Sequence, residues 1–172
     1  MKMIDVLLAE MDQEAQSTAR VLERVPQAKL SWKPHAKSMS LGQLALHVAT
    51  IPGNVAELAS HTTMPEPPAF VQPEAATAAE LVPALKASLE KARQILGGMD
   101  DAKLMETWRL MSGGKELMAM PRAAIIRVIM LNHWYHHRGQ LLVYLRMHDV
   151  PLPSVYGPTA DENPFAAALA AQ

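Results

Sequence analysis

The feature that most restricts how this chain can fold is the recurrence of apolar residues at steps of three and four. It occurs in four long segments, residues 5–24, 40–60, 77–96 and 121–147. This spacing places the apolar side chains on one face of an α-helix, and a helix with one apolar face must bury it against other elements. Four such helices in one chain predict an all-α fold, a four-helix bundle.

Local signals mark where these helices begin and how they are connected. Ser40 and Gln43 have the spacing of a capping box, as do Thr77 and Glu80, so a helix start is predicted at each pair. Between the second and third helices, a proline-rich stretch predicts a long irregular connection. Its prolines are Pro65, Pro67, Pro68 and Pro73.

A small hairpin is predicted just before the last helix. Gly113 and Gly114 separate two short alternating runs, residues 107–111 and 116–120. A glycine pair in this position is typical of a tight turn between two strands. Pro121 then suits the first turn of the last helix, where its missing N–H has no helical partner in any case.

Length and composition fit a single domain that spans residues 1–172. The chain is 49% hydrophobic and 19% charged, and its formal net charge is −1. It therefore has a core to bury and no basic surface to neutralise phosphates, so nucleic acid is not an expected partner. Residues 1–11 contain three charged side chains, unlike a secretory signal, and no segment has the roughly 20 apolar residues of a membrane helix. We expect a cytoplasmic protein with no membrane partner.

The absence of cysteine limits the chemistry available to this chain. Without cysteine the protein has no thiolate nucleophile of its own and no Cys-based structural zinc site. A thiol could take part in a reaction only as a substrate. Any metal ion would have to be bound by histidine, carboxylate or water.

A histidine-rich run in the last helix carries the strongest functional signal. His133 and His137 are four residues apart, so they project from one helical face with Cβ atoms roughly 6 Å apart, which suits two ligands of one metal ion. Protein metal sites usually have three or four protein ligands, so a third donor is needed. His47 lies on the inner edge of the second helix. Burying three imidazoles together is unfavourable unless something such as a metal ion satisfies them.

His136 leaves the ligand assignment open. It follows His133 by three residues and lies about 100° around the helix from His137, so a His133–His136 pair competes with the His133–His137 pair. Trp134 stands where a zinc peptidase motif requires glutamate, which disfavours peptidase chemistry. Histidines that are only hydrogen-bonded inside a metal-free bundle are a further alternative. Position alone makes four residues candidates to line the site: Gln43, Asn132, Gln140 and Tyr144.

Several segments resemble the DinB/YfiT-like family of helical proteins. They are residues 20–26, 32–35, 40–48, 132–141 and 150–158, and the resemblance extends over nearly the whole chain. It implies an antiparallel four-helix bundle with one histidine ligand from the second helix and an i, i+4 pair from the last. These positions correspond to His47, His133 and His137. The resemblance further implies a divalent metal ion, zinc or nickel, and a homodimer.

The same resemblance implies an activity. Characterised relatives include transferases that conjugate low-molecular-weight thiols such as bacillithiol to electrophiles, and a mycothiol-dependent isomerase. We therefore expect a metal-dependent S-transferase whose partners are a low-molecular-weight thiol and a small electrophile. Two alternatives remain, a metal-dependent hydrolase and a non-catalytic, dimeric metal-binding stress-response protein. No catalytic residue is assigned.

Overall fold

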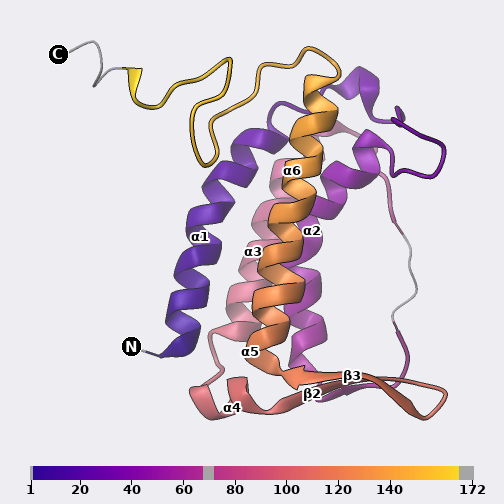
Figure 1. Ribbon diagram of the computed structural model, residues 1–172, viewed down its shortest axis with the longest axis vertical. Coiled ribbons are helices and arrows are strands. Elements are labelled where there is room, and N and C mark those ends of the chain that lie inside the picture. Colours follow the sequence, from indigo (N-terminus) through magenta and orange to yellow (C-terminus); the bar gives the residue numbers. More distant parts are fainter. Residues whose placement is uncertain (1, 68–71, 167–172) are drawn as a thin grey trace.

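The computed structural model describes residues 2–67 and 72–166, and four long helical segments form its main body (Figure 1). The first three are α1 (Met3–Leu22), α2 (Leu41–Ser60) and α3 (Leu81–Leu96). The fourth changes type along its length, from α5 (Arg122–Ala124) through the π-helix η3 (Ile125–Asn132) to α6 (His133–Arg146). Short helices lie in the connections: η1 (Gln27–Lys29), η2 (Ala78–Glu80) and α4 (Asp101–Met105).

Contacts between the helices fix their relative directions. The backbone N–H of Gly53 donates to Ser88 Oγ at 2.8 Å, and one turn further along both helices Glu57 pairs with Lys91. Residue numbers therefore increase together, and α2 and α3 run parallel. The predicted antiparallel arrangement is wrong at this pair, because the connection between α2 and α3 is long enough to return the chain to the end where α2 began.

A three-stranded sheet at one end of the helices contradicts the predicted all-α class (Figure 1). Its strands are β1 (Thr63–Met64), β2 (Thr107–Ser112) and β3 (Lys115–Pro121). The predicted hairpin is present as β2 and β3, and Gly113 and Gly114 in its turn have positive φ angles of 54° and 77°. The sheet is mixed because β1 adds to β2 in parallel, pairing Thr63 with Arg109. A two-residue strand is too short for a periodic pattern, so β1 could not be predicted from the sequence.

Two buried side chains, one from the sheet and one from α5, bind the end of α2. Trp108 in β2 donates its indole N–H to the carbonyl of Leu58 at 3.0 Å. Arg122 is fully buried and donates to the carbonyl oxygens of Ala59 and His61 at the end of α2. Free carbonyls and the negative end of the helix dipole favour a cation there. The end of α2 and the start of the last helical segment are thereby held together.

The two predicted capping boxes have different outcomes. The first is confirmed, because the backbone N–H of Gln43 donates to Ser40 Oγ and that of Ser40 donates to the Gln43 side chain. The second is wrong: Thr77 makes no capping hydrogen bond, and the Glu80 carboxylate instead accepts from the backbone N–H of Ala76 at 2.6 Å. A 3-10 turn forms at this point, and α3 begins only at Leu81.

Pro52 interrupts the hydrogen bonding of α2 near its middle. Proline has no N–H, so the carbonyl of Val48 has no helical donor, and the indole N–H of Trp134 on α6 binds it instead at 2.8 Å. On the other side, a Cβ at Gly53 would lie 2.9 Å from the Ser88 carbonyl, so glycine is required for the close approach of α3. This part of α2 is therefore fixed between α6 and α3.

The core between the helices is made of aliphatic side chains from every long helical segment. Fully buried examples are Met11, Leu44, Leu85 and Leu141. Within the described residues, every helix is either too short or too polar to cross a membrane.

Candidate metal centre

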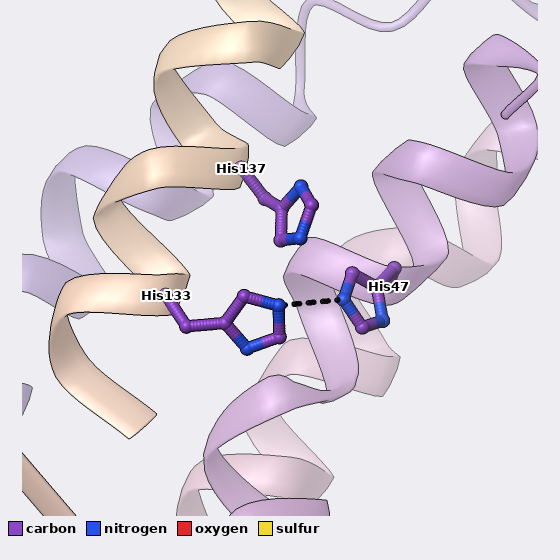
Figure 2. A group of neighbouring side chains, drawn as sticks. All are labelled: His47, His133 and His137. Atoms are coloured by element: carbon purple, nitrogen blue, oxygen red, sulfur yellow. Dashed lines mark hydrogen bonds between the residues drawn. The ribbon is translucent and has the colours of Figure 1, made fainter. Parts of the chain in front are cut away.

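The structure brings His47, His133 and His137 together between α2 and α6 (Figure 2). Nε2 of His47 lies 3.4 Å from Nε2 of His133. One ring nitrogen from each of the three residues lies within 4.8 Å of the other two, and the ring centroids are 4.5, 4.7 and 5.2 Å apart. In residues 2–67 and 72–166, this is the one group of three or more His, Asp or Glu side chains with such spacing.

Hydrogen bonds to the outer ring nitrogens orient two of the imidazoles. Nδ1 of His133 lies 3.2 Å from the carbonyl oxygen of Ile129, and Nδ1 of His137 lies 2.7 Å from Oε1 of Gln140. Both oxygens only accept, so each Nδ1 carries the proton and donates it. The Nε2 lone pairs are then free to bind a metal ion, the arrangement that metal-ligating histidines commonly use.

Burial keeps the three imidazoles neutral at physiological pH. The pKa of His47 is lowered to about 4, first by burial and then by the neighbouring His137 and His133. The pKa values of His133 and His137 are also lowered, with burial as the main cause. Neutral imidazole is the form that binds metal ions, so these donors fit a divalent cation.

Among the described residues, three histidines and no Asp or Glu side chain make up the cluster. Residues 1, 68–71 and 167–172 contain no His, Asp or Glu. A closed structural site generally has four protein ligands, whereas a catalytic site commonly has three and leaves a position for water or substrate. The three histidines match the donor number of the second kind of site.

The competing residues from the sequence lie outside this cluster. His136 is exposed, and the structure does not place it with His47. Of the candidate lining residues, Gln140 contacts His137 directly. Gln43 is used in the cap of α2, the Tyr144 hydroxyl lies 3.4 Å from a backbone carbonyl, and Asn132 is exposed.

The chain is similar to a known protein family over almost its whole length. A profile of the DinB family matches residues 1–164. The chain belongs to the DinB family. The predicted resemblance is thus confirmed, and it covers both α2 and α6 with their histidines.

Solved structures of DinB-like proteins share the fold. One from Bacillus cereus is 21% identical, with a TM-score of 0.67, and the match covers 87% of this chain and 95% of that one. Another, YjoA from Bacillus subtilis, is 24% identical, with a TM-score of 0.66 and coverage of 87% and 96%. A comparison with functionally curated proteins gave no match. At these identities the structures support the fold of this DinB protein and say nothing of its substrate.

Two residues beside the histidine pair lie in the core. Trp134 follows His133 and Arg138 follows His137 in the chain, and both are buried. Arg138 pairs with the carboxylate of Glu14 on α1, and the Tyr156 hydroxyl contacts both groups. Buried charged groups such as Arg138 and Glu14 are recognisable only when their distant partners are known. The π-helix η3 directly precedes His133, and π-helical segments are frequent at functional sites.

One hollow of the surface lies beside α4, and no histidine lines it. It has a volume of about 550 Å³, and Ile95, Met99, Lys103 and Glu106 are among its lining residues. It is shallow and contains no cluster of donor groups. The candidate site of this DinB protein is therefore assigned from donor chemistry and not from the size of a cavity.

Proposed function

We propose that this DinB protein is a divalent-metal-dependent enzyme whose ligands are His47, His133 and His137, and that the ion is zinc or nickel. Imidazole nitrogen is a good donor for both metals. The arrangement of three neutral imidazoles with their Nε2 atoms turned inward supports metal binding. The family match and the shared fold are consistent with it.

The observation that carries an enzymatic role is the number of donors: among the described residues, three histidines lie together without an Asp or Glu in their group. A divalent ion held in this way would act as a Lewis acid and lower the pKa of a thiol or water molecule beside it. The chain's own contribution is to hold the three imidazoles neutral and oriented. Burial keeps the imidazoles neutral, and the carbonyl of Ile129 and the side chain of Gln140 orient His133 and His137 by accepting from their outer nitrogens.

The proposed reaction is transfer of a low-molecular-weight thiol to a small electrophile in the cytoplasm. Because the chain has no cysteine, the sulfur nucleophile must enter as a substrate. A carbon–sulfur bond forms, the leaving group departs from that carbon with its bonding electrons, and the thiol proton passes to solvent. A homodimer is part of the proposal, as the family resemblance implies.

Two further functions fit the same donor set. A hydrolase is the second candidate, because a water molecule needs the same open position as a thiol. A non-catalytic role in stress resistance is the third. It is supported by the origin of the ligands on two helices, since an ion shared by α2 and α6 would stabilise the folded protein.

The proposal is tested by an assay on protein loaded with zinc or nickel. Bacillithiol, mycothiol and glutathione are each supplied with chlorodinitrobenzene, and thioether formation is followed by absorbance. We expect conjugation above the metal-free rate, its loss in His47→Ala, and its retention in His136→Ala, which removes an exposed imidazole from the same helix. Ester hydrolysis without conjugation would favour the hydrolase, and bound metal without either reaction would favour the non-catalytic role.

A further inference from the structure

A hydrogen bond between α2 and α6 joins the residues directly after two of the proposed ligands. Val48 follows His47, and Trp134 follows His133. The indole N–H of Trp134 donates to the carbonyl of Val48 at 2.8 Å, and the two ligand Nε2 atoms lie 3.4 Å apart beside it. The contact is therefore made one residue away from the cluster on both helices.

Pro52 leaves the carbonyl of Val48 without a donor from its own helix. In an uninterrupted helix, the carbonyl of Val48 would accept from the backbone N–H four residues later, but that residue is Pro52 and has no N–H. A buried carbonyl without a donor is unfavourable. The free carbonyl of Val48 and the fully buried indole N–H of Trp134 therefore satisfy each other's hydrogen bonding, although they lie far apart in the chain.

Metal binding places strict demands on the relative position of α2 and α6. Metal–nitrogen distances in good sites agree to about 0.2 Å, whereas sliding a helix by one residue moves its side chains about 1.5 Å. A second hydrogen bond of α6, from the Tyr144 hydroxyl to the Met39 carbonyl just before α2 begins, is longer at 3.4 Å. The indole bond is the contact best placed to fix the register at the cluster.

We propose that Trp134 is a positioning residue for the three-histidine site, acting through the Val48 carbonyl that Pro52 leaves free. The inference rests on the proposed metal-binding function and deepens it. Trp134 touches neither a metal ion nor a substrate in this account. It sets the distance between His47 on one helix and the His133–His137 pair on the other.

Substitutions of Trp134 and Pro52 separate an effect on the position of the histidines from an effect on stability. Trp134→Phe removes the donor, lowers stability, and is expected to raise the dissociation constant for zinc at least tenfold, as loss of an outer contact at a metal site commonly does. In the double variant Pro52→Ala with Trp134→Phe, residue 52 regains an N–H that can bind the Val48 carbonyl. The double variant should therefore recover stability while its zinc affinity stays low, because the link between α2 and α6 is still absent.

Trp108→Phe is the matched control. It removes another buried indole N–H that donates to a carbonyl of α2, that of Leu58. We expect lower stability and unchanged zinc affinity, because this contact lies at the far end of α2 from the cluster.

The measurements are zinc titration calorimetry and urea unfolding of the metal-free protein, for the wild type and each variant. Low affinity in Trp134→Phe that persists in the stable double variant would support positioning. Recovery of affinity together with stability would overturn it, as would unchanged affinity in Trp134→Phe. If the wild type binds neither zinc nor nickel, the proposed metal function fails, and the positioning role fails with it.

Discussion

Replacing Arg138 by methionine should strongly destabilise this protein, although the substitution leaves all three histidines in place. The side chains of Arg138 and Glu14 are 2% and 11% exposed, so their ion pair is largely shielded from water. The guanidinium also donates to the Glu14 carbonyl and to Thr18 Oγ1, both at 3.1 Å, and to the Tyr156 hydroxyl at 2.6 Å. Its removal leaves a buried carboxylate without its counter-charge.

The expected magnitude follows from that burial. Removing one partner of a buried ion pair costs about 3–5 kcal/mol in the free energy of unfolding. For a chain of this size, each kcal/mol lowers the melting temperature by about 2–4 °C, so the variant should melt roughly 6–20 °C lower. The free energy is measured by urea unfolding in the presence of EDTA, so that metal binding does not alter the apparent stability.

Two control variants make this prediction specific. Arg20→Met breaks an ion pair with Glu162 whose side chains are 44% and 32% exposed, and it should cost at most about 1 kcal/mol. Glu14→Gln combined with Arg138→Met removes both charges and should recover much of the loss. A single Arg138→Met variant within about 1 kcal/mol of the wild type would refute the claim that a buried charge pair holds α6 against α1.

Two further predictions concern the histidines. Gln140→Ala removes the acceptor of the His137 Nδ1 proton. It should weaken zinc binding roughly tenfold in calorimetry, with little change in stability. Unchanged zinc affinity would argue against an orienting role of Gln140. The pKa of His47 is about 6.5 in an unfolded chain and is lowered to about 4 in the folded protein. Between about pH 6.5 and pH 5, the unfolded chain therefore binds more protons at this residue than the folded protein does. The metal-free protein should therefore lose stability as the pH falls through that window and stay constant above it. Urea unfolding of the wild type and of His47→Gln tests this, and an equal slope in both would contradict it.

The helices and the clustering of the three histidines could be predicted because their signals are local or periodic. The Ser40 capping box lies next to the start of α2, and the four-residue spacing of His133 and His137 determines that they share a face. His47 could be added because the apolar pattern of its helix shows which side turns inward. Each of these inferences uses only the geometry of one helix.

The remaining features depend on partners far apart in the chain. The parallel pairing of Thr63 with Arg109 and the burial of Arg138 against Glu14 leave no trace in the local sequence. Pro52 in α2 indicates a free carbonyl, yet nothing in its neighbourhood says that the donor is Trp134. The all-α prediction was wrong because the predicted hairpin is part of a larger sheet, whose third strand, β1, exists only through its pairing with β2.

The most direct test of the three-histidine site is the metal content of protein purified without an affinity tag and without added metal. The wild type is compared by elemental analysis with His133→Ala and with His136→Ala, which removes an exposed neighbour outside the cluster. We expect close to one zinc or nickel ion per chain in the wild type and in His136→Ala, and almost none in His133→Ala. Metal retained in His133→Ala, or lost in His136→Ala, would contradict the assignment of the ligands.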